Sequence, residues 1–252
     1  MRTRAVDECT STMAPSDRIN VHLGRRLELL QAWTPVDARS VLDVGCAFGA
    51  ITAGLAVDGR ELYGIDVNHE YVIDAHSHYQ DIAFLVGAGE ALPFPDNHFD
   101  CVIISEVLEH VADEPRSLAE VCRVLAPGGT FLLTVPHRGP LSFLDPDNIL
   151  FHLPWVHRFL YRLKWGTIDG MLPKTREHRH YSLEAIQDLL GTAFVVDEVY
   201  PSGFMIYCLA AWLKLFFKRG RLVPVLDSLM SWDYGRRYGS ISCNLALRAR
   251  KT

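Results

Sequence analysis

The sequence lacks the features that mark membrane-spanning, secreted and polyanion-binding proteins. Its longest unbroken apolar run, residues 204–213, is about half of the ~20 residues that a membrane-spanning helix needs. No CxxC pair occurs among its six cysteines, so we expect reduced thiols and neither a zinc site nor a disulfide framework. Residues 1–15 contain no apolar segment, so we expect no signal peptide or membrane anchor, and a cytoplasmic location. The formal net charge of -5 gives no overall attraction for nucleic acid, which we do not expect as a partner.

What is present is enough for one packed domain. Of the 252 residues, 49% are hydrophobic and 22% are charged, a balance typical of a globular chain. Apolar residues at roughly helical spacing predict an entry helix over 16–33. We therefore expect a flexible tail over 1–15 and a single domain over 16–252.

After the entry helix, short runs of strand-forming residues alternate with helical stretches, which predicts a parallel sheet with crossover helices. The runs are apolar on both faces, so the sheet should be buried between two helix layers. The predicted fold is α/β: a Rossmann-like, doubly wound, mostly parallel seven-stranded sheet with helices on both faces. Insertions at about 137–181 and 201–236 should form a helical cap over the substrate. The expected strands are 41–44, 61–66, 82–87, 100–105, 130–135, 194–200 and about 240–249, and the expected helices are 50–57, 69–80, 114–125 and one from 182.

The first predicted strand leads into a turn of small residues that suits a ligand. The strand ends near Asp43, and Gly45, Ala47 and Gly49 follow. Small residues let a ligand approach the backbone, and the next helix offers free N–H groups. A dinucleotide-binding GxGxxG turn would have glycines also at positions 47 and 50, where alanines stand. The spacing therefore argues against an NAD-dependent oxidoreductase, which we keep as an alternative.

The second predicted strand ends in an acid. Asp66 lies 17 positions after Gly49, close to the about 20 expected for an acid that accepts bonds from ribose hydroxyls. The alternative is that Asp66 only caps the helix after Asn68. Two further segments stand out: VGAGEALPFPDNHFDCVIISEVLEHV over 86–111 and EVCRVLAPGGTFLLTVP over 120–136.

Together these segments, over about 40–136, resemble the class I S-adenosylmethionine-dependent methyltransferases, in the pattern of quinone-modifying and small-molecule enzymes. That family has an acid before GxGxG, a G-D-A-E-x-L-P-F loop, E-V-L-E-H and R-V-L-x-P-G-G. The resemblance implies that S-adenosylmethionine binds here and gives its methyl group to a small-molecule acceptor, by in-line displacement at the sulfonium. The implied cofactor-binding residues are Asp43, Gly45, Ala47, Gly49, Asp66, Val67, Gly89, Glu90, Ser105 and Glu106.

The chain departs from the family pattern at two positions. Ala47 replaces the middle glycine, and its methyl group should be tolerable if the backbone there does not have a positive φ. Ala88 stands where the family has an acid that accepts the adenine amino group. We therefore expect adenine to be held by backbone around Gly89 and by stacking on Val67, with weaker or less selective cofactor binding.

The loops after the fourth and fifth strands should face the methyl group, because ligands bind outside the carboxyl ends of parallel strands. His137 follows the fifth strand and is the candidate catalytic base, with His178 and His180 next. Two alternatives stay open: methyl transfer needs mainly alignment, and His137 could simply hydrogen-bond the lid backbone. The cluster 177–180 has poor spacing for a metal, so we expect none.

Two questions of function stay open at this level. Because alanines stand at positions 47 and 88, an alternative hypothesis is a non-catalytic module with the S-adenosylmethionine-binding fold that acts as a partner or regulator. The segment 204–221 is either a cap helix over the substrate or an interfacial helix that meets anionic lipid and a lipid-linked acceptor.

Overall fold

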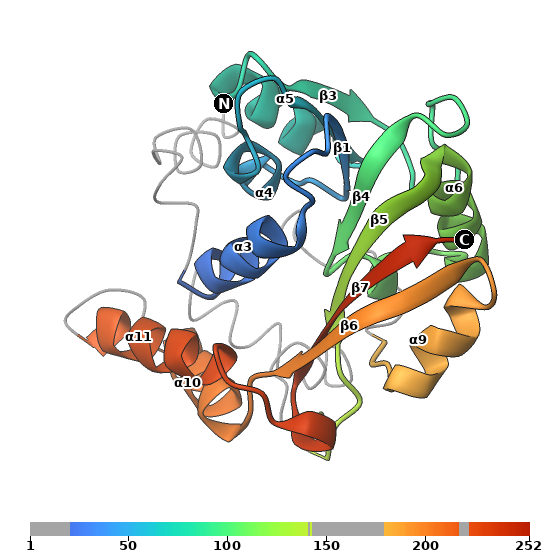
Figure 1. Cartoon of the computed structure of the whole chain (residues 1–252). Coiled ribbons are helices and arrows are strands. Elements are labelled where there is room, and N and C mark those ends of the chain that lie inside the picture. Colours follow the sequence, from blue (N-terminus) through green and yellow to red (C-terminus); the bar gives the residue numbers. More distant parts are fainter. Residues whose placement is uncertain (1–20, 141, 143–178, 217–221) are drawn as a thin grey trace.

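The computed structural model describes residues 21–140, 142, 179–216 and 222–252, and its centre is a seven-stranded sheet (Figure 1). The strand order is β3-β2-β1-β4-β5-β7-β6. β7 is antiparallel to β5 and β6, and all other neighbours are parallel. The predicted mostly parallel, doubly wound sheet is therefore confirmed. The strands are β1 Ser40–Val44, β2 Glu61–Asp66, β3 Ala83–Val86, β4 Phe99–Ser105, β5 Leu125–Pro136, β6 Phe194–Ser202 and β7 Asn244–Lys251.

Helices cover both faces of the sheet because the strand residues alternate between two apolar cores. Val41 and Ile103 pack with residues of α3 and the end of α4 on one face. Leu42 and Ile104 point to the other face, where α6 and α9 pack. Figure 1 shows this division, with α3 and α4 on one side of the sheet and α6 and α9 on the other. The helices are α3 Val21–Trp33, α4 Ala50–Gly54, α5 His69–His78, α6 Glu114–Val124, α9 Leu183–Leu190, α10 Met205–Phe216 and α11 Leu222–Tyr234, with short 3-10 turns η1 at Leu108–His110 and η3 at Gly239–Ile241.

Side-chain caps set several helix starts. Asn68 accepts a bond from the Glu70 N–H at 2.9 Å, and Asp113 accepts one from the Arg116 N–H at 3.0 Å. Ser182 caps α9, as the sequence predicts. Some boundaries were predicted wrongly. β5 begins at Leu125 and not near residue 130, because Leu125 already pairs with Phe99 before the register shifts. α4 ends at Gly54 and not at residue 57, and β7 spans Asn244–Lys251 and not about 240–249, because η3 precedes it.

The second insertion is a helical hairpin at the carboxyl end of the parallel strands. β6 runs in the same direction as β5, since both are antiparallel to β7, and α10 and α11 follow its end (Figure 1). The predicted aromatic lid over 143–165, like the predicted tail over 1–15, lies outside the described residues. In the described part of the chain, no helix has both the length and the apolarity to cross a membrane.

Candidate functional site

The turn after β1 has a strongly left-handed backbone. Gly45 has φ 78°, Gly49 has φ 76°, and Ala47 between them has φ 46°. The condition for tolerating a methyl group at position 47 is therefore not met, and a left-handed alanine costs about 1–2 kcal/mol relative to the right-handed form. The Ala47 N–H nevertheless has a partner, because it donates to the Asp66 carboxylate at 2.9 Å.

The two glycines are also required by the packing of the protein itself. A Cβ at Gly45 would lie 2.2 Å from a methyl carbon of Val107, and one at Gly49 would lie 2.6 Å from the ring of Phe84. A bulky residue at position 45 would therefore disturb the fold as well as any ligand.

Asp66 holds the turn and keeps spare acceptor capacity. Its two oxygens accept the Ala47 N–H at 2.9 Å and the Asn68 N–H at 2.8 Å. Asn68, and not Asp66, is the N-cap of α5, so the capping alternative is wrong. A carboxylate has about four acceptor positions, so about two stay available for a diol. Beside it, the side chain of Val67 is 72% exposed and can pack against a flat ring.

Asp43 is a buried carboxylate without a cation in hydrogen-bond contact among the described residues. It is 2% exposed and accepts the Thr52 hydroxyl at 2.6 Å. Burial, reinforced by the nearby charge of Asp66, raises the pKa of Asp43 to about 6. A ligand that carries positive charge would relieve this penalty, which is what an ammonium or sulfonium group would do.

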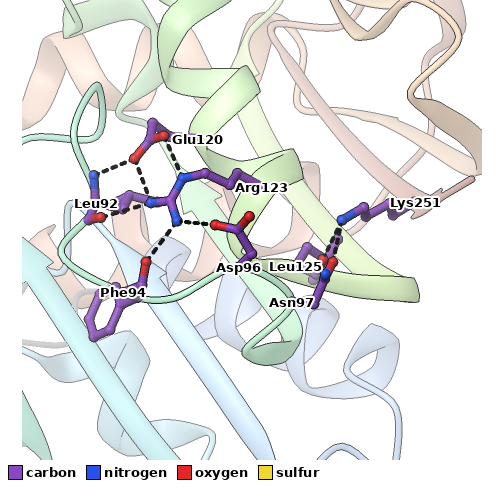
Figure 2. A network of polar contacts seen from close by, with 8 residues as sticks. All are labelled: Leu92, Phe94, Asp96, Asn97, Glu120, Arg123, Leu125 and Lys251. Carbon is purple, nitrogen blue, oxygen red and sulfur yellow. Dashed lines mark hydrogen bonds and ion pairs between the residues drawn. The ribbon is translucent and has the colours of Figure 1, made fainter.

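A polar network that we did not predict holds the loop between β3 and β4 (Figure 2). The Arg123 guanidinium donates to the carbonyls of Phe94 and Leu92 at 2.8 and 2.9 Å, and it pairs with Asp96. Glu120 binds the same guanidinium and accepts the Leu92 N–H at 2.8 Å. The available signal was the arginine of the R-V-L-A-P-G-G segment, Arg123, which is also part of the family pattern.

The first part of that loop contains the predicted residues Gly89 and Glu90. A Cβ at Gly89 would lie 2.9 Å from the Ser117 hydroxyl, so the loop lies close against α6. Glu90 accepts the Ala112 N–H at 2.8 Å and thereby ties the loop to the segment before α6. Its carboxylate thus has a structural bond in addition to any contact with a ligand.

At the ends of β4 and β5, Ser105 and Glu106 belong to a chain of hydrogen bonds. Thr134 donates to Glu106 at 2.9 Å, so the Ser105 hydroxyl, 3.0 Å from that of Thr134, must be the donor to it. Arg26 of α3 lies 3.4 Å from the Glu106 carboxylate. The sequence did not indicate Arg26, because nothing distinguishes it from the other polar residues of the entry helix.

His137 is fixed at the end of β5. It is 7% exposed, and its Nδ1 lies 3.0 Å from the Ser242 carbonyl oxygen. The Ser242 hydroxyl also lies 2.9 Å from Nδ1, so Nδ1 either donates to the carbonyl oxygen or accepts from the hydroxyl, depending on the tautomer. This partner precedes β7, and the lid lies outside the described residues, so the alternative of a bond to the lid backbone stays open. Of the other histidines considered, His180 is described and His178 lies outside the described residues, as does part of the cluster 177–180.

These groups share one edge of the sheet. Asp43 and the glycine turn, Asp66, the pair Ser105–Glu106, and His137 all lie at or just past the carboxyl ends of parallel strands β1, β2, β4 and β5. Spare acceptors on Asp66, the exposed Val67 and the buried charge of Asp43 fit a nucleoside that also carries positive charge. The residues present therefore suit S-adenosylmethionine.

Part of the chain is similar to known methyltransferases. Residues 42–133 match the family described as "Methyltransferase domain". The ubiquinone/menaquinone biosynthesis C-methyltransferase UbiE of Francisella tularensis subsp. novicida is 49% identical over 124 residues, which are 49% of this chain and 46% of that protein. The demethylmenaquinone methyltransferase of Beutenbergia cavernae is 36% identical over 158 residues, 63% of each chain.

The likeness in three dimensions extends further than the likeness in sequence. The crystal structure of the cyclase SpnF has a TM-score of 0.61 and 21% identity, covering 91% of this chain and 80% of that one. At that identity the likeness shows the fold alone. The alignments with the first curated relatives span only about half of their length, with shares of 52%, 59% and 39%. Residues 42–133 thus carry a methyltransferase domain with the fold of class I S-adenosylmethionine-dependent enzymes, and the chain is similar over part of its length to proteins named for quinone methylation.

Proposed function

We propose that the chain transfers the methyl group of S-adenosylmethionine to a small-molecule acceptor of quinol type. The observation that supports this most is the Asp66 carboxylate, which two backbone N–H groups orient while about two acceptor positions stay open. An NAD-dependent oxidoreductase would not explain the match of residues 42–133 to a methyltransferase domain.

The residues of the edge have separate roles in this proposal. Asp66 accepts bonds from the two ribose hydroxyls, and Val67 packs against adenine. Asp43 faces the ammonium group directly or through water, while Ser105 and Glu106 line the methionine end. When bound, S-adenosylmethionine supplies a methyl group that is already activated by the sulfonium, so the protein contributes mainly alignment.

His137 is the proposed proton acceptor for a hydroxyl or an acidic carbon. In the tautomer whose Nδ1 donates to the Ser242 carbonyl oxygen, Nε2 would have the lone pair that a general base requires. The proton that the acceptor loses would move to Nε2. This role rests on the position of His137 at the end of β5, and alignment alone is the competing explanation.

The direct test is binding and transfer by wild type and Asp66→Ala. Calorimetry should show that wild type binds S-adenosylmethionine and not NAD, and that Asp66→Ala loses about 1.5–3 kcal/mol of binding free energy, the value of hydrogen bonds to a charged acceptor. Circular dichroism should show that the variant stays folded. Equal affinities in the two proteins would remove the site from this edge.

We further propose that the acceptor carries an apolar chain. The curated relatives are named for quinone methylation, and the hairpin α10–α11 places apolar surface near the edge where the acceptor must enter. Methyl transfer from labelled cofactor should be faster to demethylmenaquinol than to a quinol of the same ring without a tail. Equal rates with both acceptors would show that the enzyme recognises the quinol ring and not the apolar tail.

A second candidate function is a non-catalytic binding module. The left-handed Ala47 favours it, since the same turn in the family has glycine there. Tight binding of cofactor with no transfer to any quinol would support this candidate.

A further inference from the structure

The outward face of the α10–α11 hairpin is apolar on both helices. On α10 the exposed positions recur every four residues, and on α11 they recur every three or four, so each helix presents one stripe. Soluble monomers seldom expose a continuous apolar patch of this kind without a partner. The face, which we call the hairpin face, consists of Met205, Leu209, Leu213, Leu222, Val225, Leu229 and Trp232, exposed by 54%, 59%, 36%, 42%, 52%, 42% and 48%.

The hairpin face is not needed to hold the helices in place. The opposite side of α11 buries Leu226 and Met230, and α11 packs against α3. The buried Asp233 fixes the start of α10, because it accepts the N–H groups of Phe204 at 2.7 Å and Tyr207 at 2.8 Å. The exposed stripes are therefore additional apolar surface on a hairpin that is already anchored.

A shallow groove lies along α11, where Val225, Leu229 and Trp232 of the hairpin face line it. It has a volume of about 540 Å³ and is open to solvent. Apolar side chains dominate its lining, with Ser228 as the polar exception. The lining residues are Ile206, Pro224, Val225, Ser228, Leu229 and Trp232.

The charges near the hairpin face are mostly positive. Arg236 lies over the ring of Trp232 with its guanidinium carbon 3.8 Å from the ring centroid, and Arg237 beside it is exposed. On α11 the acids are Asp227, at its middle, and the buried Asp233. An apolar face with basic surroundings matches an anionic lipid surface.

We propose that the hairpin face docks on an anionic lipid bilayer, with its leucines and Trp232 in the headgroup boundary. Tryptophan and arginine are residues that place an apolar body in lipid and a polar end in water. A symmetric contact with a second copy would instead bring like charges together.

Docking deepens the proposed function by naming a lipid surface as partner, and it can be tested without cofactor or acceptor. Full-length protein would be sedimented with vesicles of phosphatidylglycerol and phosphatidylcholine, and with phosphatidylcholine alone. We expect binding to the anionic vesicles, less binding to the neutral ones, and weakening by added salt. A loss of methyl transfer with vesicle binding intact would count against the proposed function only.

The decisive variant is the double substitution Leu209→Glu/Val225→Glu, which should lower binding to anionic vesicles at least about tenfold. The matched control is Ile73→Glu/Val195→Glu, whose wild-type side chains are 56% and 50% exposed on α5 and β6. Both variants should keep the wild-type Tm, because all four positions are exposed.

Three results would overturn the proposal. Wild type could fail to bind anionic vesicles, or the Leu209→Glu/Val225→Glu protein could bind them as well as the control does. Alternatively, light scattering could show a wild-type dimer that Leu209→Glu/Val225→Glu dissociates, with no vesicle binding by either protein. That last result would assign the hairpin face to a second copy of the chain.

Discussion

Replacing Asp43 with asparagine should make the ligand-free protein more stable and its cofactor binding weaker. Asp43 is almost fully buried, and its pKa is raised to about 6 from an ordinary value of 3.8. A pKa about two units above the ordinary value corresponds to about 3 kcal/mol of unfavourable free energy in the ionised folded state. Asparagine removes the charge and keeps an oxygen that can accept the Thr52 hydroxyl.

The sign of the pH dependence follows from the direction of this shift. Below about pH 4, Asp43 is protonated in both folded and unfolded chains, so wild type has no penalty. As the pH rises from about 4 to about 6, the unfolded chain is ionised while folded Asp43 still holds its proton, so the folded state is progressively destabilised. The NH2 group of the buried asparagine needs hydrogen-bond acceptors, which should offset about half of the 3 kcal/mol gain in stability. The Tm of Asp43→Asn should then exceed that of wild type by about 3–6 °C at pH 8. The difference should shrink as the pH is lowered from 6 toward 4.

Differential scanning calorimetry at pH 8 and pH 5 measures the stability, and titration with S-adenosylmethionine measures the affinity. We expect affinity to fall by about 10- to 100-fold at pH 8, since a charged partner of the ligand is lost. The reasoning would be refuted if Asp43→Asn were less stable than wild type at pH 8. It would equally fail if the variant bound cofactor as tightly as wild type.

Three further substitutions test the rest of the site. Ala88→Asp should tighten cofactor binding by about 1 kcal/mol in calorimetry, because it supplies an acceptor for the adenine amino group; an unchanged affinity would mean that adenine does not reach the loop. His137→Ala should lower turnover by about 100- to 10,000-fold with little change in cofactor affinity, and unchanged turnover would leave alignment as the only catalytic contribution. Arg123→Met should lower the free energy of unfolding by about 1–3 kcal/mol in urea titration, since the carbonyls of Leu92 and Phe94 lose their donor; a variant as stable as wild type would show that the loop does not depend on Figure 2's network.

The sheet was predictable because its strands are buried on both faces. Continuous apolar runs such as those of β1 and β4 can be read without knowing their neighbours, and the helices between them impose parallel pairing. The passage from α6 into β5 was harder to predict. Proline and glycine usually end a helix and delay the next strand, but here Leu125 enters the sheet directly and the irregularity falls inside β5.

The candidate site was predictable only where one residue type at one position carries the chemistry. Asp66 and the glycine turn are of this kind. The polar groups that support the site, such as Arg26 and Arg123, depend on side chains meeting across more than 25 positions of sequence. Nor could sequence reveal that Ala47 is left-handed, because the flanking residues allow either backbone form.

The fit between Gly45 and Val107 has a consequence for how this family can vary. The absence of a side chain at position 45 makes room for the two methyl groups of Val107, the residue directly before η1. Gly45 is therefore constrained by contact with Val107 as well as by its φ of 78°. The two positions should therefore change together over evolutionary time. A homologue with alanine or glycine at position 107 would remove one of the two constraints, and asparagine or aspartate, which tolerate the left-handed region, would then become acceptable at position 45.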